Sequence, residues 1–180
     1  MDEKPMDETN HSDIDYHHPQ VVDQSDFEYG LTEQDKMELR LWLRLLTCST
    51  MIEQRVRDRL REGFEFSLAR FDVLAQLDRA PEGLSMGELS SRLMVSGGNA
   101  TGLTSRMLAE GMITREPVAH DRRRQVVRLT EHGRRLFKQM YPEHARWIHE
   151  AMSGLSGDEQ QLLLGLLGKL KKQLTDGGPK

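Results

Sequence analysis

Two short helical segments joined by a tight break occupy residues 85–111 and constrain the fold more than any other part of the chain. The sequence SMGEL is a capping box, because Ser85 can cap the first helix while Glu88 reaches back to the cap. The sequence MVSGGN breaks that helix, Ser96 begins the next one, and Gly111 closes it. Two short helices joined in this way describe a helix-turn-helix.

A basic cluster follows the second helix, inside a region of strand-like alternation. Residues 112–116 and 125–129 predict two strands, and the consecutive arginines Arg122–Arg124 lie between them at the tip of the expected hairpin. Because crowded arginines repel one another, the cluster indicates an anionic partner. A basic tip beside a helix-turn-helix can reach DNA phosphates or the minor groove, with Asp121 holding one arginine in position.

Four further helices are predicted around this module. Each follows a residue suited to cap a helix, namely Thr32, Ser67, Thr130 and Ser156. The first helix spans roughly 33–62 and ends near Gly63, the third runs to about Met152, and Glu159 completes a second capping box before the last. We therefore predict a mainly α fold with a small two-stranded β wing, a winged helix-turn-helix with N- and C-terminal dimerisation helices.

Composition and pattern divide the chain into five segments. They are an acidic, disordered arm over 1–30, an N-terminal dimerisation helix over 31–62, a winged helix-turn-helix DNA-binding domain over 63–138, C-terminal dimerisation helices over 139–174, and a tail over 175–180. Residues 1–36 carry 11 acidic and two basic side chains, a balance of -9, and the remainder carries +5, so the total is -4. Residues 85–138 alone carry 10 basic and five acidic side chains, also +5, which indicates a basic module in an otherwise balanced chain.

The helix predicted over 97–110 has one apolar face and one face of small and polar residues. Ala100, Leu103, Thr104 and Met107 recur at the spacing of a packing face. The side chains that we expect to contact DNA from this helix are Ser96, Asn99, Thr101, Ser105 and Arg106. Asparagine can pair with adenine and arginine with guanine in the major groove. An ordinary solvated helix face is the alternative for this pattern taken alone.

The sequence DRRRQVVRLTEHG at 121–133 resembles the wing of the MarR family, the multiple-antibiotic-resistance-type winged helix-turn-helix regulators. The sequences LARFDVLAQL, LSMGELSSRLMVS and TGLTSRMLAEGMITR precede it in that family's order, so the resemblance covers about residues 31–174. It implies a dimeric, sequence-specific transcriptional regulator, more commonly a repressor, that a small ligand releases from DNA. By position, it implies that Asp121 braces the wing, Arg123 enters the minor groove, and residues 96–106 begin the recognition helix.

Two features depart from the pattern of that family. The acidic arm is longer than the family core requires, and the sequence SGGNATGL is glycine-rich for a recognition helix. Arg106 matches a position that is arginine in many relatives, where bracing the wing competes with touching DNA. The chain is also similar to members that control the breakdown of hydroxycinnamates and other aromatic acids, which suggests a role in aromatic compound catabolism.

The last helix is apolar around most of its circumference. Its sequence QQLLLGLLGKL holds six leucines, and Gly165 and Gly168 would allow a second helix to approach closely. A helix buried in its own domain is the alternative, but a chain of 180 residues has little left to cover both terminal helices. We predict a homodimer through about residues 33–50 and 141–174, whose two-fold symmetry matches a palindromic operator on double-stranded DNA.

Enzyme motifs are missing from the sequence. It contains no G-x-G-x-x-G, no phosphate-binding P-loop and no H-E-x-x-H, and His144 and His149 lie about 140° apart around a helix. We predict no enzyme, no metal and no cofactor; His11, His17 and His18 are expected to belong to a solvated tail. Two alternatives remain open, a redox-responsive regulator of the same fold using Cys48 and a non-DNA helical scaffold protein. Cys48 is expected on the apolar face of the first helix, where a buried cysteine serves as inert packing.

The first predicted helix and the junction after it carry candidate residues for an effector. Two arginines flank a tryptophan there, which suits an anionic aromatic molecule, and three phenylalanines could form an apolar wall. These residues are Arg40, Trp42, Arg44, Phe64, Phe66 and Phe71. We expect a small aromatic carboxylate, or its coenzyme A thioester, to bind there and to release DNA. Core packing of the tryptophan with solvated arginines is the alternative.

Membrane and export signals are also missing from the sequence. No apolar run approaches the ~20 residues of a membrane span, and no signal-peptide pattern opens the chain. The single cysteine fits a reducing compartment. We expect no membrane partner and a cytoplasmic location, associated with the bacterial nucleoid.

Overall fold

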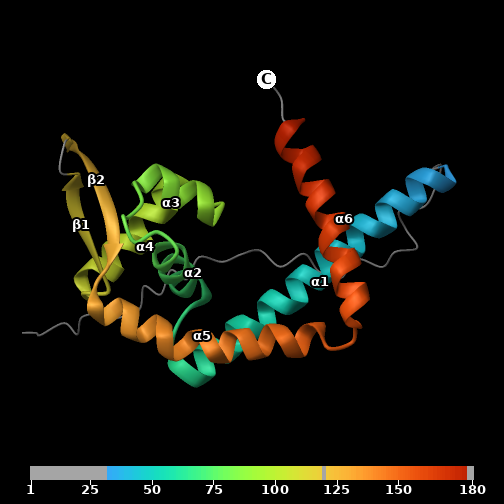
Figure 1. Cartoon of the computed structure of the whole chain (residues 1–180), viewed down its shortest axis with the longest axis horizontal. Coiled ribbons are helices and arrows are strands. Elements are labelled where there is room, and N and C mark those ends of the chain that lie inside the picture. The colour runs from blue at the N-terminus through green and yellow to red at the C-terminus, as the bar shows by residue number, and fades with distance from the viewer. Residues whose placement is uncertain (1–31, 119–120, 178–180) are drawn as a thin grey trace, which may run out of the picture. The chain divides into compact units, whose positions relative to one another are not determined.

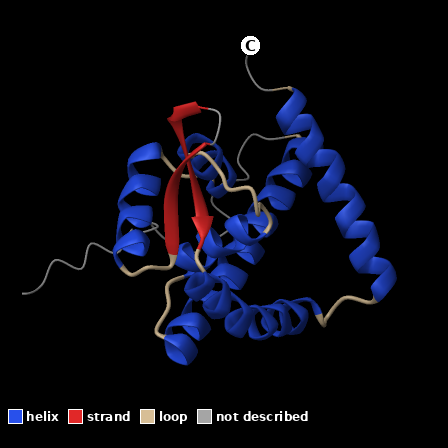
Figure 2. Ribbon diagram, turned by 60° about the vertical axis from the view of Figure 1, so that its left-hand side comes forward, coloured by secondary structure: helices blue, strands red, loops and turns tan. Residues whose placement is uncertain are grey.

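The computed structural model describes residues 32–118 and 121–177 of the chain (Figure 1). Its elements are α1 Glu33–Phe64, α2 Leu68–Asp78, α3 Met86–Leu93, α4 Gly97–Ala109, β1 Ile113–Val118, β2 Asp121–Leu129, α5 Glu131–Met152 and α6 Gly157–Asp176. The fold is mainly helical with one two-stranded antiparallel sheet, as the sequence predicts (Figure 2). The expected disordered arm, residues 1–30, lies outside the described residues.

Each predicted capping residue lies at the start of its helix. The hydroxyls of Ser67, Ser85, Ser96, Thr130 and Ser156 accept a hydrogen bond from the backbone N–H three residues later. Both predicted capping boxes are complete, because the Glu88 and Glu159 carboxylates also accept from the backbone N–H of the capping serine. These bonds satisfy N–H groups that the first turn of a helix leaves without partners, so they fix where the helices begin.

The first helix ends slightly later than the sequence indicates. Gly63 lies inside α1, and the helix is closed by Glu65, which adopts a left-handed backbone conformation with φ of 52°. The Glu65 N–H donates to the Arg61 carbonyl and the Phe66 N–H donates to the Leu60 carbonyl, 3.0 and 3.3 Å away. The predicted end near Gly63 is confirmed to within two residues, although a non-glycine residue supplies the left-handed turn.

The chain forms two compact units, residues 1–51 and residues 52–180, and α1 contributes to both. In the first unit, the described part of α1 is a single helical segment, which cannot cover its own apolar face. Met37, Leu41, Trp42 and Met51 are accordingly exposed. Cys48 is exposed as well, so the expectation that it is a buried packing residue is wrong for the isolated chain.

The second unit holds the hydrophobic core. Helix α2 contacts α3, α4, α5 and β2, and it buries Phe71, Val73, Leu74 and Leu77. Helix α6 contributes no buried side chain. The other elements and the loops between them contribute Val56, Leu60, Leu84, Leu89, Met107, Met112, Ile113, Val127, Phe137, Met140 and Trp147. Each fully buried side chain of this size stabilises the fold by about 1.5–3 kcal/mol, which makes α2 the support for the helix-turn-helix.

Strands β1 and β2 form the wing, with Ile113 opposite Leu129 and Val118 opposite Asp121. Regular pairing ends with Pro117 opposite Gln125, where the register shifts. Arg122–Arg124 are part of β2 but oppose no residue of β1 in this register, so they form an irregularity in the strand and not the turn that the sequence predicts. Alternating apolar residues mark only the inner, regularly paired part of the hairpin, and β2 continues beyond them through the shift in register. Residues 119–120, which join the strands, lie outside the described residues.

The loop between α2 and α3 docks on the base of the wing. Leu84 and Val127 exchange two backbone hydrogen bonds of 3.0 and 2.7 Å. Gly83 precedes this bridge with a φ of 85°, and a Cβ there would lie 2.8 Å from the Arg128 Cγ and 2.9 Å from the Val127 carbonyl oxygen. Glycine is required at this position both by its backbone conformation and by the close approach of β2.

None of the helices in the described part of the chain is both long and apolar enough to cross a membrane.

Candidate nucleic-acid interface

Helix α4 packs one face into the core of the second unit. Ala100, Thr104 and Met107 are fully buried, as their spacing predicts. The Thr104 hydroxyl donates to the Ala100 carbonyl oxygen at 2.8 Å, which satisfies a polar group that would otherwise be costly to bury. Contacts of α4 with α2, α3 and β1 fix the direction in which its opposite face points.

The opposite face of α4 is exposed and carries the five residues expected to contact DNA. Two of them also hold the helix together, because the Ser96 Oγ accepts from the Asn99 N–H at 3.3 Å and the Thr101 Oγ1 donates to the Gly97 carbonyl at 2.8 Å. Ser105 and Arg106 are exposed one turn further along. The structure therefore presents an amide, hydroxyls and a guanidinium from one rigid helix, the groups that read base edges in a major groove.

Three glycines on α4 leave parts of its exposed surface without side chains. A Cβ added at Gly97, Gly98 or Gly102 would meet no atom of the described chain within 4 Å. Glycine inside a helix costs about 1 kcal/mol relative to alanine, and no internal contact explains that cost here. The first turn of α4 also leaves N–H groups directed outward at the positive end of the helix dipole, where an anion is favoured.

The wing adds a second basic element. Asp121, Arg122, Arg123 and Arg124 lie in β2, and their side chains are outside the described residues. Further along β2, the Arg128 guanidinium donates to the Glu82 carbonyl oxygen from Nε at 3.0 Å and from Nη2 at 2.8 Å, and it pairs with Glu116 at 3.2 Å. Arg128 thus fastens the wing to the loop after α2, whereas Arg122–Arg124 stay candidates for DNA contact.

The residues expected to bind an effector fall into two groups. Arg40, Trp42 and Arg44 belong to the first unit and all three are exposed. In the second unit, Phe66 and Phe71 are buried members of the core, and Phe64 is half-buried with its ring centre 6.3 Å from that of Trp147. Because the core already uses these phenylalanines, the exposed Trp42 and its flanking arginines carry most of the effector hypothesis.

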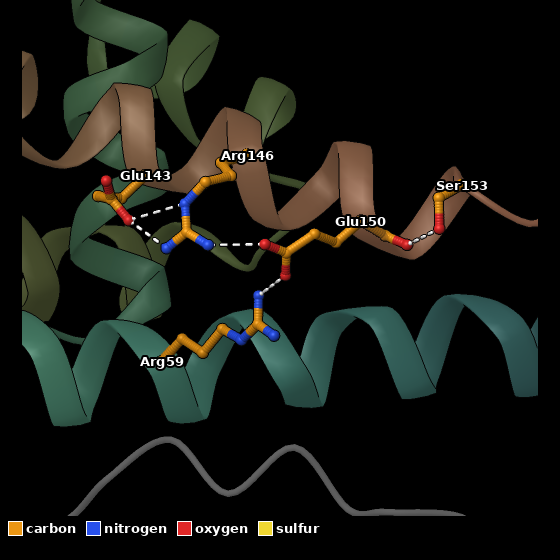
Figure 3. A network of polar contacts seen from close by, with 5 residues as sticks. All are labelled: Arg59, Glu143, Arg146, Glu150 and Ser153. Atoms are coloured by element: carbon orange, nitrogen blue, oxygen red, sulfur yellow. Dashed lines mark hydrogen bonds and ion pairs between the residues drawn. The ribbon is translucent and has the colours of Figure 1, made fainter.

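Figure 3 shows an ion-pair network that the sequence does not reveal. The Glu150 carboxylate on α5 accepts from Arg59 of α1 and from Arg146, each at 2.6 Å, and Arg146 also pairs with Glu143. The hydrogen bond from Arg59 is the main cause of the lowered pKa of Glu150. The i,i+3 and i,i+4 spacing of the three α5 residues is readable in sequence, but their link to Arg59 is not.

A small pocket adjoins this network and is lined by Ile52, Arg55, Val56, Arg59, Trp147, Glu150 and Ala151. The Arg59 guanidinium carbon lies 5.9 Å from the centre of the Trp147 ring, so it is held by the indole as well as by Glu150. Because Glu150 already neutralises the Arg59 guanidinium, we assign Arg59 a structural role, which is to link α1 to α5 within the second unit.

Asp72 is a further residue whose environment the sequence does not reveal. Burial of its carboxyl group on α2, with a further contribution from the charge of Glu53, raises its pKa to about 6. On α5, burial lowers the pKa of His144, whose ring stacks on Phe71 at 4.6 Å between centres. No sequence signal marks either shift, because both arise from packing between elements that are distant along the chain.

Metal ligands do not cluster in the part of the chain that the structure describes, where no group of three or more His, Cys, Asp or Glu could hold an ion. His11, His17 and His18 lie outside the described residues.

Comparison with known proteins places this arrangement among transcription regulators. A sequence model described as the MarR family matches residues 64–124, which span α2 through the basic part of β2. The chain is 33% identical over 150 residues to the transcriptional activatory protein BadR from Rhodopseudomonas palustris, covering 79% of this chain and 85% of that protein.

Solved structures show the same likeness. A crystal structure of a MarR family transcriptional regulator from Silicibacter pomeroyi is 33% identical to the chain, with a TM-score of 0.65 over 79% of this chain and 99% of that one. The fold is also that of a mutant MarR from E. coli complexed with operator DNA, at 23% identity and a TM-score of 0.67, covering 77% of this chain and 99% of that one.

Proposed function

The chain belongs to the MarR family of DNA-binding transcription regulators, and from that premise we propose that it is a homodimeric repressor of a palindromic operator. The observation that carries the proposal is the exposed face of α4, where Asn99, Ser105 and Arg106 project from a helix whose other face is locked in the core. A rigid helix with small and polar exposed side chains can enter a major groove closely enough to contact base edges.

The dimer is proposed from apolar surface that the single chain leaves uncovered. Helix α6 has no buried residue, and its exposed leucines are Leu162, Leu163, Leu164, Leu166, Leu167, Leu170 and Leu174. The described start of α1 adds exposed Met37 and Leu41. Apolar surface on this scale marks an interface rather than a solvated face, and an isologous dimer would bring two copies of α4 to two half-sites.

The test begins with the wild-type protein and a pool of random duplexes. Selection of bound sequences should enrich a palindrome whose half-sites lie about one helical turn apart, and sedimentation of the complex should show two chains per operator. Asn99→Ala should change the preferred base at one position of each half-site, whereas Gln139→Ala, an exposed change on α5, should not. Enrichment of no sequence, or full-affinity binding by one chain, would refute the proposal.

Repression is proposed as the sign of regulation, and BadR is named an activatory protein, so the sign needs its own measurement. Transcription in vitro from a promoter that carries the selected operator should fall when the protein is added. A rise in transcript would show an activator that uses the same interface.

The effector proposed is a small aromatic carboxylate or its coenzyme A thioester. Its support is the exposed Trp42 with Arg40 and Arg44 two residues to either side, a combination of a flat ring and cations that suits an anionic aromatic molecule. Calorimetric titration with hydroxycinnamates and their thioesters, with and without operator, tests it. Linkage requires that an effector which releases DNA binds less tightly when operator is present.

A redox-responsive regulator is a second candidate, because Cys48 is exposed on α1 in the isolated chain. An exposed thiol is open to oxidants, whereas a buried one is inert. Treatment with peroxide should then release operator from the wild type and leave Cys48→Ser bound. If peroxide affects operator binding equally in the two proteins, Cys48 is not the sensor, and the regulator controlled by a ligand is favoured.

A further inference from the structure

A half-buried arginine of α2 lies against the C-terminal end of α4. The Arg70 Nη2 donates to the carboxylate of Glu110, the residue that caps α4. The same nitrogen lies 3.4 Å from the Met112 Sδ, and the guanidinium carbon lies 4.5 Å from the centre of the Phe66 ring. One anion, one sulfur and one aromatic face therefore hold this guanidinium in a single position.

Glu110 has a second cation within reach, the exposed Arg106 of α4. Arg106 precedes Glu110 by four residues, the spacing at which oppositely charged side chains pair on a helix surface. The Glu110 N–H donates to the Arg106 carbonyl oxygen at 3.0 Å, so the two residues lie on consecutive turns. Within the described part of the chain, however, the Glu110 carboxylate forms its ion pair with Arg70 and not with Arg106.

The two arginines are close enough to influence each other. Burial lowers the pKa of Arg70, and the charge of Arg106 lowers it further. Two guanidinium groups therefore lie near the Glu110 carboxylate, and the half-buried one, Arg70, forms the ion pair with it. Pairing with Arg106 instead would neutralise the guanidinium on the exposed face of α4, and it would put a carboxylate beside DNA phosphates.

We propose that Arg70 is a positioning residue for DNA recognition, which holds Glu110 away from Arg106 and so leaves the Arg106 guanidinium available to DNA. This inference rests on the proposed function, because it requires that the exposed face of α4 meets DNA. Arg70 itself is half-buried and acts through the two charged residues of α4.

A simpler role would be a clamp that only holds α4 against α2. The two roles predict different effects of Glu110→Gln, which removes the charge and keeps a hydrogen-bond acceptor. Operator binding should weaken if Arg70 is only a clamp, and it should stay unchanged if Arg70 is a positioning residue. A clamp loses strength when either partner is changed, so Glu110→Gln and Arg70→Met should both weaken operator binding. A positioning residue becomes dispensable once the competing carboxylate is gone, so the double variant should bind like the wild type.

The experiment measures operator affinity by fluorescence anisotropy for the wild type, Arg70→Met, Glu110→Gln and the double variant. Methionine keeps an apolar stem over Phe66 while removing the charge. Arg70→Met should weaken binding about tenfold, the loss of one good contact to DNA, while Glu110→Gln and the double variant stay within about twofold of the wild type. Arg146→Met is the matched control, because it removes a paired guanidinium from α5 and should leave affinity unchanged.

Circular dichroism confirms that each variant is folded. If Arg70→Met does not fold, Arg70→Lys keeps the charge and should bind like the wild type, and Glu110→Gln alone still separates the two roles. A double variant as weak as Arg70→Met, or a Glu110→Gln variant that loses tenfold, overturns the role of Arg70 while leaving the regulator intact. Failure of the wild type to bind any duplex overturns the proposed function itself, and this inference with it.

Discussion

Gly133 is the position where the structure predicts the sharpest effect of a single methyl group. It is the third residue of α5, is buried, and donates its N–H to the Thr130 hydroxyl at 3.0 Å. A Cβ at this position would lie 2.1 Å from the Met112 carbonyl oxygen and 3.4 Å from a methyl group of Leu129. Because favourable contacts lie near 3.5 Å, Gly133→Ala must increase the distance between this carbon and the Met112 carbonyl oxygen by about 1.4 Å, which moves α5 away from the start of β1.

The cost follows from what that movement disturbs. The Met112 carbonyl oxygen accepts a hydrogen bond from the Thr130 N–H at 3.1 Å. The Thr130 hydroxyl has one proton to donate, and it lies 2.7 Å from the Gly111 carbonyl oxygen and 3.0 Å from that of Met112. Overpacking costs about 1–3 kcal/mol and each weakened hydrogen bond adds about 0.5–1.5 kcal/mol. The higher helix propensity of alanine relative to glycine offsets at most about 1 kcal/mol of this cost, and less than that in the first turn. We expect Gly133→Ala to lower the free energy of unfolding by about 2–3 kcal/mol.

The assay is urea unfolding at one fixed protein concentration, because association also stabilises the folded chain. In thermal unfolding, a loss of this size should lower the melting temperature by roughly 4–12 °C for a chain of this length. Gly87→Ala is the matched control. Gly87 is an exposed helical glycine of α3 where an added methyl group would meet no atom of the described residues within 4 Å, so alanine should be neutral or stabilising. A Gly133→Ala protein as stable as the wild type would refute the packing argument.

Three further predictions concern the wing, the interface and a buried carboxyl. Arg123→Ala should weaken operator binding and make the slope of log affinity against log salt shallower by about 0.9, measured by anisotropy at several salt concentrations; an unchanged slope would contradict a phosphate contact. Leu166→Glu, at an exposed position of α6, should yield a folded monomer in sedimentation equilibrium; a persisting dimer would exclude α6 from the interface. The Asp72 pKa is raised from 3.8 to about 6, so the folded chain binds the extra proton and its stability falls as pH rises between those values. Asp72→Asn should therefore exceed the wild type by up to about 3 kcal/mol at pH 7.5 and match it near pH 4 in urea unfolding; equal curves at both pH values would show that Asp72 is hydrated.

Helix starts could be predicted from the sequence because capping is a local property. Ser85 with Glu88, and Ser156 with Glu159, need only four consecutive residues to complete their bonds, and the structure has both boxes. The inward face of α4 could be predicted for the same reason, since the spacing of Ala100, Thr104 and Met107 fixes it before any partner is known.

Interactions between distant segments could not be predicted in this way. Arg70 and Glu110 lie 40 residues apart, and Arg59 and Glu150 lie 91 apart, so no spacing rule relates them. The raised pKa of Asp72 likewise depends on burial by neighbouring elements. The outer part of the wing could not be predicted for another reason, because its residues are charged and lie at a shift in the strand register, which leaves no apolar alternation to detect.

Helix α6 shows how the same pattern can mean different things in a chain and in an assembly. Its leucines could belong to a helix buried in its own domain or to a contact between copies, and periodicity alone does not separate the two. In the structure none of its residues is buried, which excludes the first interpretation for the described chain. A helix of 20 residues with no buried side chain gains little from tertiary packing, which supplies most of the stability of helices in proteins. The stability of α6 should therefore depend on dimerisation. Because the dimer also sets the distance between its two DNA-binding domains, dimerisation and operator recognition should weaken together on dilution.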